Sequence, residues 1–247
     1  MQKRGLSQEG LKLIACITML LDHIGLVIVM DCFENATGAA KGTWLDIYEI
    51  LRTIGRLAFP IYCFLLVEGY AHTSNPKRYG FRMLLVALLS EIPYDLVCYG
   101  QINWQRQNVM VTLLLGLWML EAMKRCPHWL LRLLALMPFA YLAQQLHTDY
   151  GAKGILVIAM FALTREMPYK LLLQLFGLWF IFSPSHLMAL NWLSKFSVTT
   201  QELAVFSLVP IALYDGRKIT KSRALQWAFY LFYPVHLLVL GILMMLV

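Results

Sequence analysis

The chain has 247 residues, of which 60% are hydrophobic and 14% are charged, and its mean hydropathy is +0.63. Soluble domains average about 45–50% apolar and about 25% charged residues, so this composition excludes a soluble globular protein and indicates a multi-pass membrane protein. The net charge of +7 is typical of surplus Lys and Arg on the cytoplasmic side of such proteins, and without a basic patch interleaved with aromatic residues we expect no nucleic acid partner.

Apolar runs recur along the whole chain with no soluble domain between them. A bilayer span takes about 20 mostly apolar residues, so we predict an all-α, polytopic membrane helix bundle of about nine transmembrane helices, with eight to ten as the range, forming a single domain over residues 1–247. The sixth and eighth runs are short, and Ser183-Pro184-Ser185 interrupts the seventh. The runs cover residues 10–30, 52–71, 81–99, 108–123, 129–146, 151–164, 169–187, 202–214 and 224–246.

The basic residues predict the orientation of these helices. With nine spans, Lys and Arg gather in every second loop, which places the N-terminus in the cytoplasm and the C-terminus outside. The predicted outer loops hold few bases, at Lys41, Arg106, Lys153 and Lys195. The predicted inner loops hold Lys3, Arg4, Lys77, Arg78, Arg82, Lys124, Arg125, Arg132, Arg165, Lys170, Arg217, Lys218, Lys221 and Arg223.

Ionisable residues inside the predicted spans are the candidate functional residues. Each costs a few kcal/mol near the bilayer centre, so such residues mark cavities, relays or binding sites, although pairing between helices is the structural alternative. Glu68 lies near an inner end, where it can also reach the interface by snorkelling. The set comprises Asp22, His23, Arg56, Glu68, Glu91, Asp95 and His236.

Helix rise places three of these residues at a similar depth. Counted from the inner boundary, His23 lies roughly 18 Å in, His236 roughly 17 Å and Glu91 roughly 14 Å. Asp95 follows Glu91 by one turn on the same face, and Arg56 reaches down from the outer end of its helix. The sequence therefore predicts one cluster built from several helices.

Charge balance suggests how this cluster is arranged. Three carboxylates and one guanidinium cannot all stay ionised in a low dielectric, so either a carboxyl group is neutral or a histidine is protonated, as acid–base catalysis needs. Asp22 points about 100° around the helix from its neighbour His23, so we expect Asp22 to pair with Arg56. Glu91 is then free to orient a histidine from a neighbouring helix.

Other polar residues are expected at the same level. Asn108 opens the fourth span, Tyr150 opens the sixth, and Tyr233 shares a face with His236 three residues later. These three residues and Asp95 are candidates for substrate binding, with an aromatic interface belt as the alternative for the tyrosines.

Several membrane chemistries lack their motifs. There is no HExxH sequence and no GxSxG sequence, which argues against a zinc protease and a serine hydrolase. The five cysteines are scattered without a CxxC pair, so neither a disulfide scaffold nor a metal site is expected. Direct attack of a substrate on an activated donor, with histidine as the base, fits these residues best.

Six motifs, in order, carry a family resemblance. They are LLDHIG, GRLAFPIYCFLLVEGY, RMLLVALLSEIPYDL, QNVMVTLLLG, YGAKGILVI and FYLFYPVHLLVLG. Together they resemble the TraX family, whose founding member is the conjugative pilin N-acetylase of F-type plasmids, and more distantly the multi-helix transmembrane acyltransferases.

The resemblance implies acetyl transfer from cytoplasmic acetyl-CoA to an acceptor at the membrane or its outer face, in the inner membrane of a bacterium. The acceptor is a protein or peptide N-terminal amine such as that of pilin, or another amine or hydroxyl group. Asp22 and His23 would be the catalytic pair, Arg56 and Glu91 their supports and His236 a further site residue. Inner-face bases are natural partners for the CoA phosphates, and the candidates are Lys77, Arg78, Arg217 and Lys218.

Two alternatives stay open. A proton-coupled transporter can use the same His, Asp and Glu residues as a relay, and a membrane assembly factor can contain them as structural ion pairs. Neither the oligomeric state nor a covalent acetyl-histidine follows from the sequence.

Overall fold

The structure, a computed structural model, describes residues 5–183, 200–220 and 222–246. Every named element in this described part is a helix, which confirms the all-α fold. Several residues invoked above lie outside it, namely Lys3, Arg4, Pro184, Ser185, Lys195 and Lys221.

The described helices divide into two compact units. Two helices contribute to both units. Helix α4 (Ala58–Ala71) begins in the first unit and continues into the second unit, and α11 (Arg223–Leu246) begins in the second unit and ends in the first unit. The first unit otherwise holds α1 (Gln8–Ile24), the π-helix η1 (Gly25–Val29), α2 (Met30–Asn35), α3 (Ala39–Gly55), α9 (Lys170–Phe182), the 3₁₀-helix η2 (Thr200–Ser207) and α10 (Leu208–Ala212). The second unit holds α4 (Ala58–Ala71), α5 (Pro76–Tyr99), α6 (Val109–Arg125), α7 (Trp129–Gln145), α8 (Gly151–Thr164) and α11 (Arg223–Leu246).

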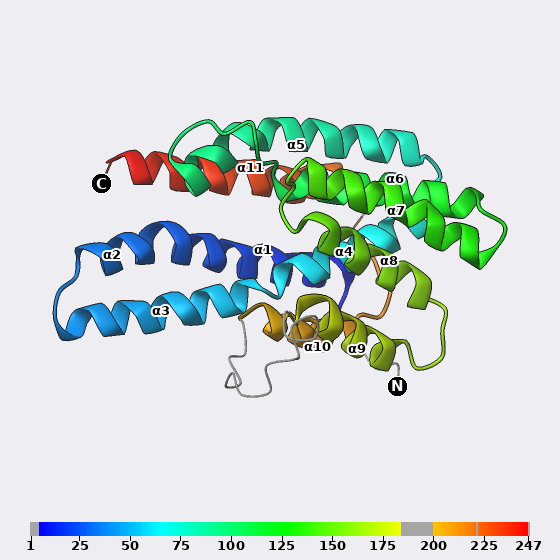
Figure 1. Cartoon of the computed structure of the whole chain (residues 1–247), viewed down its shortest axis with the longest axis horizontal. Coiled ribbons are helices and arrows are strands. Elements are labelled where there is room, and N and C mark those ends of the chain that lie inside the picture. The colour runs from blue at the N-terminus through cyan, green and yellow to red at the C-terminus, as the bar shows by residue number, and fades with distance from the viewer. Residues whose placement is uncertain (1–4, 184–199, 221, 247) are drawn as a thin grey trace. The chain divides into compact units, whose positions relative to one another are not determined.

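A long helical hairpin dominates the first unit. Ser7 caps α1 by accepting a hydrogen bond from the Gly10 N–H at 3.1 Å. The chain then stays helical through η1 and α2, turns at Gly38 with φ of +60°, and returns as α3 beside them (Figure 1). Glycine suits this turn because it adopts positive φ without steric cost.

Two predicted boundaries are wrong. Residues 39–51 were expected in an outer loop but form most of α3, because tertiary packing on α1 and α2 compensates for their charged residues. The run 202–214 was expected to span the membrane as one α-helix. It forms η2 and the five-residue α10 instead.

In the second unit, α5, α6, α7 and α8 pack against their sequence neighbours, and α6 also packs on α8. A Cβ atom at Gly116 of α6 would lie 2.2 Å from the terminal Cδ1 of Ile158 of α8, so glycine lets this side chain pack directly on the α6 backbone. Met119, Ile155 and Ile158 are fully buried in the resulting core.

Three helical segments of the described chain are long and apolar enough to cross a bilayer, as expected for a membrane protein. They are Gln8–Asn35 with 28 residues, Ala39–Ala71 with 33 residues and Arg223–Leu246 with 24 residues. Large apolar side chains also point outward on the shorter helices, as at Trp129 (71% exposed) and Phe176 (65% exposed). Such a surface is costly in water and favourable in hydrocarbon.

Candidate functional site

Asp22 lies in an ion pair between the two arms of the hairpin. Its Oδ2 atom accepts a hydrogen bond from Arg52 Nη1 at 2.7 Å, and both side chains are less than one-fifth exposed. The predicted pair with Arg56 is therefore wrong, since Arg52, one turn earlier on α3, makes the contact. Arg56 ends α3 as its C-cap residue, and its charge still acts on Asp22.

A glycine makes room for this ion pair. A Cβ atom at Gly55 would lie 2.2 Å from Asp22 Oδ1 and 2.3 Å from Asp22 Cβ. Just beyond, Gly25 packs against Leu51 and opens the π-helix. Such π-helical turns inside α-helices frequently occur at functional sites. His23, half-buried on α1, lies between the Asp22 ion pair and this turn.

Glu91 and Asn108 meet in the second unit, where α6 begins. Asn108 is fully buried and caps α6 by accepting a hydrogen bond from the Met110 N–H at 2.9 Å. Its amide nitrogen donates to Glu91 Oε2 and, at 2.9 Å, to the Ala87 carbonyl of α5. The sequence prediction placed these two residues on neighbouring spans, and their side chains are in direct contact.

Tyr233 and His236 of α11 are also buried, with exposed fractions of 5% and 6%. The backbone of Val109 and the carboxylate of Glu91 are both close enough to act on the Tyr233 hydroxyl electrostatically. His236 Nδ1 lies 2.7 Å from the Phe232 carbonyl oxygen. If Nδ1 carries the proton and donates it there, Nε2 is the acceptor nitrogen of the neutral ring.

Asp95 and Thr112 contact the loops that follow α5 and precede α8, and Tyr150 lies at the start of α8. Asp95 is fully buried, and its Oδ2 accepts a hydrogen bond from the Asn103 N–H at 2.8 Å. Tyr150 is the N-cap residue of α8 and has φ of +66°, a conformation that is uncommon for residues other than glycine. Thr112, on α6, donates to the Asp149 carbonyl and so ties this loop to the start of α6.

Buried polar atoms without a hydrogen-bond partner gather in the predicted site residues. Such atoms are few in native proteins, and each needs an explanation such as a substrate or a water molecule. Among the described residues, seven side chains contain one. Four of the seven atoms belong to predicted site residues, namely Asp22 Oδ1, Arg56 Nε, Glu91 Oε1 and Asp95 Oδ1.

The four candidate partners of the CoA phosphates have different surroundings. Lys77, Arg78 and Lys218 are exposed. Arg217 forms an ion pair with Asp215, with Nε 2.5 Å from Oδ2, and donates to the Gly5 carbonyl at 3.2 Å. Partial desolvation raises the pKa of the Asp215 carboxyl, but the hydrogen bonds from Arg217 and its positive charge together have the larger effect. The pKa of this carboxyl is therefore lowered overall. A phosphate at Arg217 would therefore compete with a carboxylate that is already in place.

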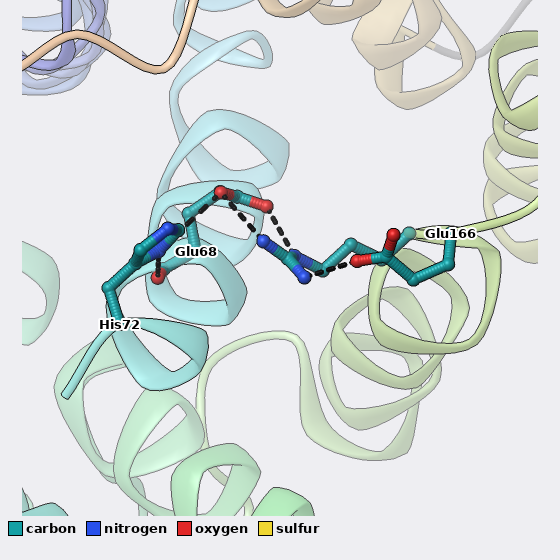
Figure 2. A network of polar contacts seen from close by, with 4 residues as sticks. Glu68, His72 and Glu166 are labelled. Atoms are coloured by element: carbon teal, nitrogen blue, oxygen red, sulfur yellow. Dashed lines mark hydrogen bonds and ion pairs between the residues drawn. The ribbon is translucent and has the colours of Figure 1, made fainter. Parts of the chain in front are cut away.

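Glu68 has a partner that the sequence did not suggest. Arg165, just after α8, donates from Nε to Glu68 Oε1 at 2.7 Å and from Nη2 to Oε2 at 3.4 Å, and it also contacts Glu166 (Figure 2). His72 Nδ1 lies 2.8 Å from the Glu68 carbonyl oxygen. Glu68 therefore forms an interhelical ion pair, the structural alternative to a catalytic role.

Arg165→Gln should lower the free energy of unfolding by about 1–2 kcal/mol, because it leaves the mostly buried Glu68 carboxylate without its charge partner. Urea or SDS titration of purified protein measures the change. Arg125→Gln is the matched control: Arg125 is 72% exposed and pairs with Glu121 one turn away, so its loss should cost less than about 0.5 kcal/mol. Equal losses in both variants would contradict a special role for the Glu68 pair.

Comparison with known proteins gives a consistent result. Residues 7–244 match the family model described as TraX protein. A protein of Dichelobacter nodosus called probable fimbrial assembly protein FimC, serogroup H1, is 31% identical over 93% of this chain and 92% of its own length. An uncharacterised protein of Rickettsia prowazekii (strain Madrid E) is 28% identical over 44% of this chain and 34% of its own length. No solved structure matches the chain.

Proposed function

Because the chain belongs to the TraX family, we propose that it is an acetyltransferase of the bacterial inner membrane that uses cytoplasmic acetyl-CoA. The acceptor is an amine, with the N-terminal amine of a pilin-like subunit as the first candidate. The similarity to a protein named for fimbrial assembly supports this acceptor class, and the membrane-spanning helices support the location.

The observation that carries the proposal is the set of unpartnered buried polar atoms on Asp22, Arg56, Glu91 and Asp95. A purely structural set of ion pairs would satisfy its polar atoms internally, since an unsatisfied group in a low dielectric is costly. Bound reactants with hydrogen-bonding groups would satisfy the unpartnered atoms of each unit instead. His23, next to Asp22, supplies the titratable nitrogen that acyl transfer needs.

In the proposed reaction, the acceptor nitrogen forms a bond to the thioester carbonyl carbon, and the carbon–sulfur bond breaks. His23 accepts the proton that the acceptor amine loses and passes it to the departing CoA sulfur. The products are an N-acetylated acceptor and free CoA, with no net oxidation or reduction. Asp22, held by Arg52, favours the protonated imidazole in the transition state.

The other site residues would bind and orient the reactants. In the first unit, Arg56 is a donor that can stabilise the negative charge on the thioester oxygen. In the second unit, Asn108 and Tyr233 are donors that can bind polar groups of a reactant. Glu91 and His236 of the second unit are further candidates for reactant binding, and the amine that attacks the thioester is neutral. No metal ion takes part in this scheme.

Acetyl-CoA turnover by the purified full-length protein tests the function. We expect CoA release that saturates with acetyl-CoA and depends on a peptide with a free N-terminal amine, together with a mass increase of one acetyl group on that peptide. The same peptide acetylated beforehand is the control and should give no release above background. A protein that neither binds acetyl-CoA nor releases CoA with any free-amine peptide contradicts the proposal.

Measuring CoA release together with proton movement in proteoliposomes separates the enzyme from the proton-coupled transporter. A transporter that uses these residues as a relay would acidify or alkalinise the lumen of proteoliposomes when given its substrate, and it would release no CoA. CoA release without proton movement therefore favours the transferase.

A further inference from the structure

A pocket opens between the first turns of α5 and α11, which lie side by side in the second unit (Figure 1). Its volume is about 410 Å³, within the size range of small-molecule sites. Both helices begin at this end and so direct the positive ends of their dipoles toward it. Its lining includes Arg78, Phe81 and Arg82 from α5 and Arg223, Trp227 and Tyr230 from α11.

The charges of this pocket are unbalanced. Arg78, Arg82 and Arg223 bring three guanidinium groups to it, and none of its lining residues is acidic. Within the described chain these three arginines form no ion pair, whereas four other arginines do, namely Arg52, Arg125, Arg165 and Arg217. An anion would relieve the mutual repulsion of the three charges.

The helix positions of these arginines make the imbalance greater. Arg223 is the first residue of α11 and Arg78 the third of α5, and a cation near a helix N-terminus is unfavourable. Arg82 Nε is buried without a hydrogen-bond partner. A general preference for basic residues on the inner face of a membrane protein requires only that they reach water, and it does not explain why they line one pocket.

Aromatic rings lie next to these charges. The Trp227 and Tyr230 ring centroids are 6.0 Å apart, and Trp227 is 43% exposed. The Arg82 guanidinium carbon lies 5.8 Å from the Tyr230 centroid. Exposed rings and guanidinium planes stack on flat heteroaromatic rings, while guanidinium groups bind phosphates in a bidentate manner. The combination fits a ligand with several phosphates and a base better than an isolated phosphate.

We propose that this pocket binds the phosphorylated adenosine end of CoA, with Arg78, Arg82 and Arg223 on the phosphates and Trp227 against the adenine. The inference rests on the proposed use of acetyl-CoA. It assigns the donor site to the second unit, where Tyr233 follows Trp227 by about 9 Å along α11. The pantetheine arm would then run along α11 toward the cluster of Glu91, Asn108 and Tyr233.

Calorimetric titration of the purified full-length protein in detergent micelles tests the pocket. We expect saturable binding of CoA and of adenosine 3′,5′-bisphosphate, and at least tenfold weaker binding of adenosine. Arg82→Gln and Arg223→Gln should each weaken binding of the bisphosphate at least tenfold. Trp227→Ala, which removes no charge, should also weaken it about tenfold. Arg132→Gln is the control, because Arg132 is an exposed arginine in the first turn of α7 and lies outside the pocket, and this variant should bind like the wild type.

Three results would overturn the proposal. One is wild-type affinity for the bisphosphate in the folded Arg82→Gln, Arg223→Gln and Trp227→Ala proteins. Another is no binding of CoA or the bisphosphate at all. The third is a lipid site, in which the protein binds phosphatidylglycerol from doped micelles, loses this binding in Arg82→Gln, and does not bind the bisphosphate.

The pocket and the proposed function can fail separately. If the protein transfers acetyl groups but the pocket variants keep the wild-type KM for acetyl-CoA, the function stands and the pocket assignment is wrong. If no acceptor is acetylated but bisphosphate binding depends on Arg82 and Arg223, the pocket assignment stands and acetyl transfer is wrong.

Discussion

His23→Ala should lower the rate of acetyl transfer about 10²–10⁴-fold, which is the usual contribution of a general base. The acceptor amine must lose a proton when its nitrogen bonds to the thioester carbon, and His23 is the titratable nitrogen next to the Asp22–Arg52 ion pair. Release of CoA, followed with a thiol reagent, and the mass of the acceptor peptide measure the loss. The variant should elute from a sizing column and unfold like the wild type, because His23 is half-buried.

His72→Ala provides the matched control for this result. His72 is also a histidine near a carboxylate, but its side chain is 70% exposed, and it follows the end of α4, where it contacts Glu68 one turn earlier. Its replacement should leave the transfer rate within about twofold of the wild type, as an exposed residue outside a site should. A folded His23→Ala protein that transfers acetyl at the wild-type rate would remove His23 from the mechanism.

The fold was predictable where hydrophobicity alone decides the structure. The run 151–164 predicted α8, which is Gly151–Thr164, because a continuous apolar run in a membrane protein has to be helical. The start of α3 could not be found in this way. Its residues include Lys41 and Asp46, and the helix is stabilised by packing on the opposite arm, which apolar run length does not report.

The candidate site was predictable in its residue types but not in all of its contacts. Depth counting brings Glu91 and His236 to one level and also predicts Asn108 and Tyr233 there, and the structure shows that Asn108 contacts Glu91 and that Tyr233 lies close to it. The partner of Asp22 was assigned to Arg56 because Arg56 was the base counted inside the predicted run 52–71, whereas Arg52, the first residue of that run, was not considered. In the structure α3 begins at Ala39, so Arg52 lies well inside a helix, one turn before Arg56 on the same face, and pairs with Asp22.

Such contacts also depend on residues without a reactive or charged side chain, and Gly55 is the clearest example. No pattern in a single sequence distinguishes Gly55 from Gly42, since both are glycines inside α3. In the structure, a Cβ atom at Gly55 would lie 2.2 Å from Asp22 Oδ1, whereas a Cβ atom at Gly42 would have no neighbour within 4 Å. The same substitution at these two positions should therefore have opposite effects.

Gly55→Ala should lower the free energy of unfolding by about 2–3 kcal/mol, because the new methyl group forces α1 and α3 apart and strains the Asp22–Arg52 ion pair. It should also reduce acetyl transfer, since Asp22 then no longer supports His23. Gly42→Ala should raise the free energy of unfolding by about 0.5–1 kcal/mol through helix propensity alone and leave transfer unchanged. Denaturant titration and CoA release of both proteins provide the measurements. Equal stability of the two variants would show that the two arms of the hairpin do not approach closely at Gly55. The close approach that holds Asp22 beside Arg52 would then be contradicted.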